Sequence, residues 1–138
     1  MTSSVSIQCP TFDDLKTLTV GNATVINGSQ WSIDPRTSTG TQVTDTLFQN
    51  AVNADSGYSL IGGNADPYLN GAPQLNCSLP SNQGIITVSG VYYDWSCQQC
   101  TYQQCLLNGN LLGNSTVPCN SNKISNCVVT CNKVQPNK

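Results

Sequence analysis

Hydrophobic residues occur along this chain in short alternating runs separated by turn-forming residues. The clearest run covers residues 18–33 and has β-branched and aromatic residues on both sides of Asn27-Gly28. Asn-Gly favours the two positive φ angles at the centre of a type I′ turn, so this pattern predicts a β-hairpin. A second run, residues 85–95, is rich in Ile, Val, Tyr and Trp. It predicts a strand with a bulge at Gly90.

Helical periodicity is confined to two short segments. Residues 44–57 have one apolar face and predict a helix of about three turns. Thr44 or Asp45 is expected to cap its start, and Gly57 to stop it. The apolar face consists of Leu47, Phe48, Ala51 and Val52. Residues 9–18 fit either a turn of helix capped by Thr11 or the entry to a strand.

The remaining segments carry weaker signals. Residues 58–82 are dense in Gly, Pro, Asn and Asp, which predicts an ordered loop with at most one short strand. The first eight and last seven residues are too polar to dock by themselves, so neighbouring copies or partner chains are expected to hold them.

Taken together, these patterns predict a single, mainly β domain over residues 1–138. It has a small β-sandwich-like or irregular β body (10–95) with one short helix, and a disulfide-rich C-terminal subdomain (96–131).

Composition gives a polar but almost uncharged surface. The chain has 16 Asn, 11 Gln, 15 Ser and 14 Thr, against 12 charged residues and a net charge of −2. Five cations form no basic stripe, which disfavours nucleic acids and anionic membranes as partners.

No apolar run is long enough to span a bilayer, so membrane insertion is not expected. Residues 1–8 have neither the basic nor the apolar region of a secretion signal. Either a signal was removed and Met1 is an added start, or oxidation follows another route.

Catalytic chemistry has few candidates. The chain has no His, which removes the commonest general base near neutral pH and every Ser-His or Cys-His nucleophile. We expect a protein that is not an enzyme and that needs no cofactor.

Eight cysteines carry the strongest chemical signal. They are Cys9, Cys77, Cys97, Cys100, Cys105, Cys119, Cys127 and Cys131. Six fall within one 35-residue window that has too few apolar residues for a core of its own. An even number of cysteines among polar loops predicts a disulfide framework, although eight cysteines allow 105 pairings. A Cys9–Cys77 bridge would contribute about 4 kcal/mol in the loop-entropy description.

Two other uses of the cysteines compete with this prediction. Cys97-x2-Cys100 and Cys127-x3-Cys131 offer four thiolates for zinc, but four cysteines then remain over and the second spacing is unusual. A redox role for Cys97 and Cys100 needs a nearby cation or helix N-terminus, and the nearest lysine in the sequence is Lys123. We favour disulfides and expect no metal.

The segment Tyr92-Tyr93-Asp94-Trp95 is the candidate binding surface. An acid among aromatic rings resembles a sugar platform, and a glycosidase would need a second carboxylate facing Asp94. The simpler interpretation is that the rings pack over the neighbouring strand and the first cross-link, with Asp94 at the strand end.

Asparagine and aspartate suggest two further kinds of site. Asn64, Asp66 and Asn70 offer oxygens to Ca²⁺, but their spacing fits no standard loop, and turn formation explains them more simply. Glycosylation sequons begin at Asn22, Asn27, Asn76 and Asn114.

Residues 18–29, Leu-Thr-Val-Gly-Asn-Ala-Thr-Val-Ile-Asn-Gly-Ser, resemble strand-turn units of fibre and capsid-associated proteins of large DNA viruses and phages. The resemblance covers about a dozen residues. It implies a protein located in a virion and oxidised by a viral thiol oxidase. The expected function is a non-enzymatic structural protein of a particle or surface appendage, such as a minor capsid, cement or decoration protein, with other subunits or copies of itself as partners. The alternative is a secreted or cell-surface binding module for carbohydrate.

Overall fold

Most of the secondary structure of the protein consists of β-strands. The computed structural model describes residues 3–66, 72–96, 100–111, 116–120 and 122–134. The first half contains β1 (Ser3–Gln8), α1 (Phe12–Leu15), β2 (Thr24–Ile26), β3 (Ser29–Ile33), α2 (Asp45–Ala54) and β4 (Ser59–Asp66). The second half contains β5 (Ala72–Ser81), β6 (Gly84–Tyr92), β7 (Thr101–Leu107), β8 (Asn110–Leu111), β9 (Val117–Pro118), the 3₁₀ turn η2 (Ile124–Cys127) and β10 (Val128–Val134).

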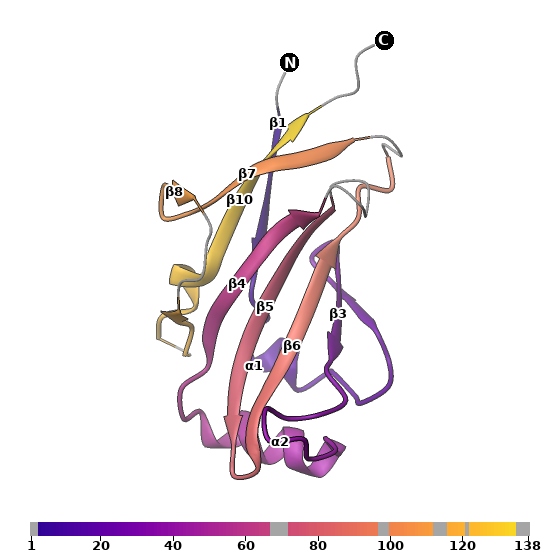
Figure 1. Ribbon diagram of the computed structural model, residues 1–138, viewed down its shortest axis with the longest axis vertical. Coiled ribbons are helices and arrows are strands. Elements are labelled where there is room, and N and C mark those ends of the chain that lie inside the picture. Colours follow the sequence, from indigo (N-terminus) through magenta and orange to yellow (C-terminus); the bar gives the residue numbers. More distant parts are fainter. Residues whose placement is uncertain (1–2, 67–71, 97–99, 112–115, 121, 135–138) are drawn as a thin grey trace.

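These strands form two sheets, and every pairing between named strands is antiparallel. One sheet has six strands in the order β2-β3-β6-β5-β4-β9, and the other has four in the order β1-β10-β7-β8. In Figure 1 the four-stranded sheet lies beside β4, and β7 crosses near the ends of β4 and β5. The predicted mainly β fold with disulfides is therefore confirmed.

The core lies against one face of the six-stranded sheet. Alternate residues of β3 are buried, so Trp31 and Ile33 point inward while Gln30 and Ser32 face solvent. The amphipathic helix α2 packs on β5 and contributes Phe48, which is fully buried. A single hydrophobic cluster extends from this face to residues of β7 and β10.

The hairpin and the helix α2 form where the sequence predicts them, and of the two alternatives for residues 9–18 the helical turn α1 is present. Asn27 and Gly28 have φ angles of 51° and 85° and join β2 to β3. Thr11 and Asp14 form a capping box on α1, and Thr44 caps α2. The predicted stop at Gly57 is wrong, because α2 ends at Asp55, whose φ of 47° is left-handed.

The loop predicted over residues 58–82 is wrong. This segment contains β4 and β5, two of the longest strands in the described chain. The two prolines of β5 lie where it has a neighbour on one side only, Pro73 beside β4 and Pro80 beside β6. Proline is tolerated at such positions because no ladder hydrogen bond need be lost on the open side. A register shift between Leu60 and Gly62 accommodates the glycines.

The bulge predicted at Gly90 is also wrong. Gly90 pairs in regular register with Trp31 on β3 and Leu75 on β5. A Cβ atom at Gly90 would lie 2.3 Å from the Trp31 indole. The glycine therefore makes room for a buried ring.

The N-terminal segment differs from expectation. The first strand, β1, pairs along its length with β10 of the same chain, so its described part needs no neighbouring copy to hold it. The predicted disulfide-rich C-terminal segment contains the Cys105–Cys131 and Cys119–Cys127 bridges, and its described strands contribute to both sheets. The last four residues lie outside the described part.

Candidate functional site

Three disulfides have both of their cysteines among the described residues. Cys9 pairs with Cys77, Cys105 with Cys131, and Cys119 with Cys127. The Cys9–Cys77 bridge joins the end of β1 to β5, and so connects the two sheets covalently. Cys105–Cys131 joins β7 to β10 at the point where their register shifts.

The remaining predicted cysteines are only partly described. Cys100 is buried and disulfide-bonded, whereas Cys97 lies outside the described residues. Cys127 and Cys131, which the zinc alternative places on one metal, belong to two different bridges. The structure therefore does not bring that pair together as free thiolates.

The predicted binding surface divides into an inward and an outward part. Tyr92 is the last residue of β6, and its ring makes an edge-to-face contact with Tyr102 of β7 at a centroid distance of 5.5 Å. The ring also lies against Gly28 of the hairpin turn. Tyr93 and Trp95 follow the strand and pair with each other on the outside.

Asp94 lies between these aromatic residues and binds the four-stranded sheet. Its carboxylate is 2.7 Å from Lys133 Nζ and accepts a hydrogen bond of 3.0 Å from the Tyr102 hydroxyl. Tyr102 and Lys133 are direct cross-strand neighbours on β7 and β10. The Ser96 backbone N–H and hydroxyl donate to the second carboxylate oxygen. We call Asp94, Ser96, Tyr102 and Lys133 the Asp94 clamp.

The Asp94 clamp holds a largely buried ion pair whose desolvation is offset by hydrogen bonds. The Asp94 side chain is 11% exposed and that of Lys133 is 15% exposed. The Lys133 ammonium, helped by Ser96, holds the pKa of Asp94 well below its usual range. Burial and the bond to Asp94 raise the pKa of Tyr102 above its ordinary value. Asp94 is thus a permanently charged anchor that fastens the end of β6 to the other sheet.

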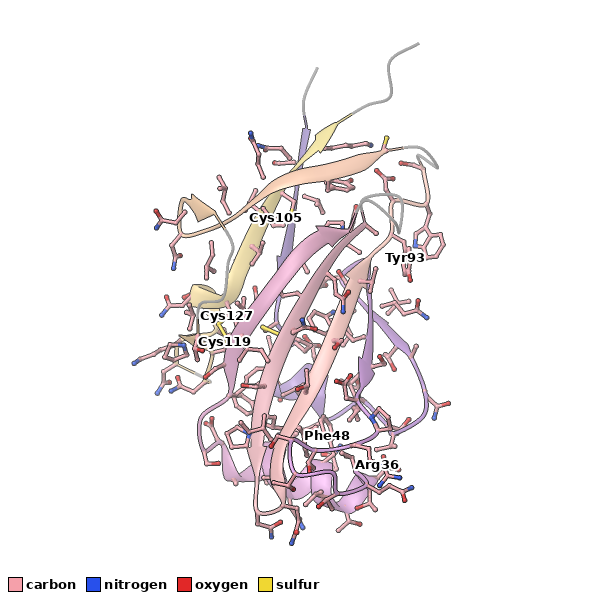
Figure 2. All side chains as sticks on the ribbon, in the orientation of Figure 1. Arg36, Phe48, Tyr93, Cys105, Cys119 and Cys127 are labelled. Carbon is pink, nitrogen blue, oxygen red and sulfur yellow. A yellow bond between two sulfur atoms is a disulfide. The ribbon has the colours of Figure 1, made fainter. Side chains whose placement is uncertain are left out.

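Tyr93 and Trp95 form a surface feature that we call the aromatic tip. Trp95 is 76% exposed, although it is a large apolar residue. Its ring lies 5.0 Å from that of Tyr93, centroid to centroid, with an angle of 34° between the planes. Figure 2 shows Tyr93 at the end of β6, across the molecule from Cys119 and Cys127. The clamp fixes the backbone on which the tip is carried.

This geometry does not suit Asp94 to acid catalysis. A carboxylate whose pKa is lowered, and which already accepts bonds from three residues, has no proton to donate near neutral pH. A separate hollow of about 340 Å³ lies beside α2 and the turn between β5 and β6. None of the residues that line it is ionisable.

Sequence reasoning missed three members of the clamp, namely Ser96, Tyr102 and Lys133. Lys133 is 39 positions from Asp94, and only the pairing of β10 with β7 brings Tyr102 and Lys133 together. The one available signal was alternation along β10, which places Lys133 on the same face as the buried Cys131.

The other predicted sites differ in how far the structure describes them. The side chains of Asn64, Asp66 and Asn70, the calcium alternative, lie outside the described residues. Asn22 and Asn27 are exposed in turns, whereas Asn76 lies within β5 and accepts a hydrogen bond from Ser89. Asn114 is outside the described part. Among the described residues no helix is long and apolar enough to cross a membrane.

No protein family, curated protein or solved structure matches this chain significantly.

Proposed function

We propose that this protein is a non-enzymatic, disulfide-stabilised structural subunit of a particle or surface appendage, such as a minor capsid, cement or decoration protein of a virion. The observation that carries the proposal is the aromatic tip. An indole that is 76% exposed on a clamped backbone is a ready anchor for a protein interface, because it gains contact area with little loss of conformational entropy.

A second feature favours protein partners, namely the outer edge of β1. The other edge strands described, β2, β8 and β9, have three, two and two residues, whereas β1 has six and carries neither charge nor proline. The Cys9 backbone N–H bonds to Cys127 on the β10 side. Successive residues of a strand direct their backbone N–H and C=O groups to opposite sides. The N–H and C=O groups of Ser4, Ser6 and Gln8 therefore point away from β10, toward the open edge. An unprotected edge of this kind can accept a strand from a neighbouring subunit.

The polar, nearly uncharged surface agrees with close packing among subunits. With 12 charged residues in 138, few ionic side chains need to be desolvated when copies pack together. The described disulfides between sheets would keep each subunit rigid, which lowers the entropy cost of assembly.

The alternative function is a secreted or cell-surface carbohydrate-binding module that uses the same tip. Trp95 offers an exposed ring on which a sugar could stack. The ring centroids of Tyr93 and Trp95 are 5.0 Å apart and the ring planes are tilted by 34°, so the two rings contact each other. They do not lie side by side as a flat surface on which a sugar ring could stack. The carboxylate of Asp94 is also engaged and offers sugars little hydrogen bonding. We therefore rank this function second.

Fractionation of the native source tests the proposal. The expected result is that the protein sediments with large particles and rebinds to stripped particles, and that Trp95→Ala abolishes rebinding. Ile85→Ala is the matched control, because Ile85 is 44% exposed and lies at the opposite end of β6 from the tip. A monodisperse monomer that ignores particles but binds glycans on an array through Trp95 would support the alternative. A monomer that binds neither would refute both functions.

A further inference from the structure

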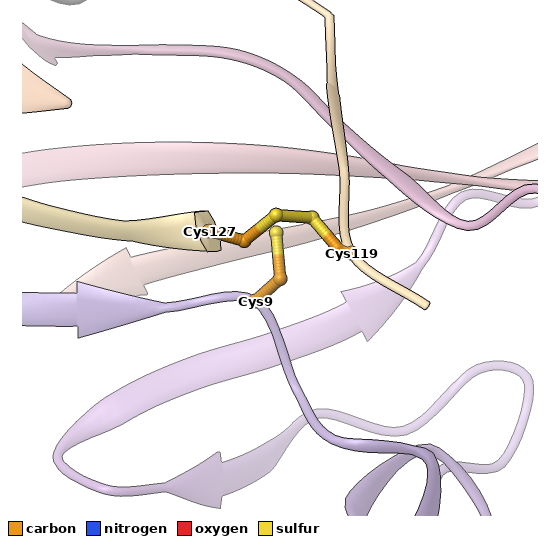
Figure 3. Close-up of side chains that lie close together, drawn as sticks. All are labelled: Cys9, Cys119 and Cys127. Atoms are coloured by element: carbon orange, nitrogen blue, oxygen red, sulfur yellow. A yellow bond between two sulfur atoms is a disulfide. The ribbon is translucent and has the colours of Figure 1, made fainter. Parts of the chain in front are cut away.

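Three cysteine sulfurs meet at one buried point of the fold, and a fourth is bonded to one of them. Cys9 follows β1, Cys77 lies in β5, Cys119 follows β9 and Cys127 ends η2. We call these four residues the sulfur cluster; each is at most 1% exposed. The Sγ atoms of Cys9, Cys119 and Cys127 all lie within 4.8 Å of one another. Figure 3 shows the Cys9 side chain directed at the bridge between Cys119 and Cys127.

This convergence exceeds what two separate cross-links require. A disulfide needs only two cysteines at suitable distance, and the Cys105–Cys131 bridge shows such an isolated pair. In the sulfur cluster the fourth sulfur, that of Cys77, is one bond from Cys9. Tetrahedral zinc with four thiolates has Zn–S distances of about 2.3 Å, which places the sulfurs roughly 3.8 Å apart. The three sulfurs of Cys9, Cys119 and Cys127 already lie close to that spacing.

We propose that the sulfur cluster, when both of its disulfides are reduced, is a binding site for a soft divalent cation such as Zn²⁺. For each bridge, a reductant supplies two electrons and two protons are taken up: a dithiol gives its own protons and becomes a disulfide, whereas a phosphine becomes a phosphine oxide with the oxygen and protons of water. The two S–S bonds break and four thiols result. The cation then binds the four sulfurs and displaces four protons.

Backbone contacts that do not involve sulfur hold the cluster in place. The Cys9 N–H donates to the Cys127 carbonyl at 3.2 Å, and the Cys119 N–H donates to the Tyr58 carbonyl at 2.8 Å. These bonds position the Cα atoms of three cysteines whether or not the bridges are closed. The reduced site is therefore partly organised before a cation arrives, which favours binding.

The ligand set differs from the one that sequence spacing suggested. That set combined Cys127 with Cys97, Cys100 and Cys131. Here Cys131 is bridged to Cys105 in the four-stranded sheet, whereas Cys9 and Cys77 are recruited from the N-terminal half. The cation would thus join the same segments that the two bridges join.

The test uses the full chain, reduced with a phosphine and titrated with Cd²⁺ under anaerobic conditions. The expected result is one Cd²⁺ per chain by native mass spectrometry, a thiolate-to-cadmium absorption band, and a higher unfolding temperature. A chain loaded first with Zn²⁺ should develop the same band when Cd²⁺ displaces the Zn²⁺, because thiolates bind the softer cation more tightly. Cys119→Ser should weaken binding at least tenfold, whereas Cys105→Ser should leave it unchanged.

Two results would overturn the proposal. One is the absence of one-to-one binding by the reduced chain. The other is an equal loss of affinity in Cys119→Ser and Cys105→Ser, which would indicate that an unfolded chain binds through any cysteine. A chain that keeps only the four cluster cysteines, with the other four replaced by Ser, gives an independent check. Failure of that chain to bind Cd²⁺ while it remains folded by circular dichroism also contradicts the site.

Discussion

The two sheets of this protein are stabilised in different ways. The twelve largest fully buried side chains in the described part of the chain include Trp31, Phe48 and Leu75, and only Val129 among them belongs to the four-stranded sheet. The six-stranded sheet has an ordinary hydrophobic core covered by α2. The four-stranded sheet is attached by the Cys9–Cys77 bridge and the Asp94 clamp, and is braced internally by Cys105–Cys131.

A very polar chain can thus hold two sheets together by apolar burial in one sheet and by cross-links to the other. Burial of apolar area contributes about 25 cal/mol per Å², and one sheet captures most of the large side chains. Cross-links act instead on the unfolded chain, by reducing its conformational entropy. A layer with few large apolar residues can therefore be kept in place without a second core.

The largest effect is expected from removing the bridge between the sheets. Cys9 and Cys77 are 68 residues apart, so the double change Cys9→Ala, Cys77→Ala should cost about 4 kcal/mol of unfolding free energy. Cys119→Ala with Cys127→Ala, which opens a loop of separation 8, should cost about 2.5 kcal/mol. Denaturant unfolding measures both. Equal costs for the two pairs would contradict the entropic account.

A change in the six-stranded sheet should cost slightly less. Gly90→Ala places a Cβ atom 2.3 Å from the buried Trp31 indole, and should destabilise the protein by about 3 kcal/mol. Trp31→Leu in the same chain should recover part of that loss, because the smaller side chain leaves room for the methyl group. Thermal unfolding of the wild type, the two single variants and the double variant gives a double-mutant cycle, which measures the interaction energy between the two positions. If Gly90→Ala unfolds like the wild type, the close contact does not exist.

The Asp94 clamp predicts a smaller effect that depends on pH. Asp94→Asn leaves Lys133 partly buried without its partner and should cost about 2 kcal/mol at pH 7. The pKa of Asp94 is lowered on folding from 3.8, so its contribution is present above that pH and is lost as pH falls toward its folded pKa. Wild-type stability should therefore fall more steeply below about pH 4 than that of Asp94→Asn. Asp13→Asn, at a side chain that is 96% exposed, is the control and should follow the wild type.

Substitutions in the aromatic tip and on the outer edge of β1 should have the smallest effect on stability. Trp95→Ala and Ser6→Lys should each change the unfolding free energy by less than about 0.5 kcal/mol. Both should reduce association with partner subunits, the first by removing the aromatic anchor and the second by placing a charge on the β1 edge. Sedimentation velocity across a range of concentrations or with particles detects the loss. Association that is unaffected in both variants would rule out these two surfaces.

Local signals in the sequence predicted the elements that local chemistry determines. The Asn27-Gly28 turn and the Thr44 cap follow from the conformations that these residues prefer, and both are present. The strands β4 and β5 were missed because Pro73 and Pro80 resemble loop residues until the neighbouring strands are known. Gly90 was misread for the same reason, since its role depends on a ring 59 residues earlier in the chain.

The candidate site was predicted in part. Residues 92–95 were recognised from their composition, but the sequence contains no sign that Tyr92 turns inward while Trp95 turns outward. The partners of Asp94 come from β7 and β10 and depend on strand register, which one chain does not reveal. Cysteine pairing is equally non-local, because each bridge depends on how the sheets meet.

Hydrogen exchange with and without a reductant tests the central claim most directly. In the oxidised protein, amides of β7 and β10 should be protected and no free thiol should be detected. Reduction in the presence of a metal chelator should remove protection from β7 and β10 first, while β3, β5 and β6 stay protected. Native protein in which all eight thiols are free and both sheets remain equally protected would contradict the account.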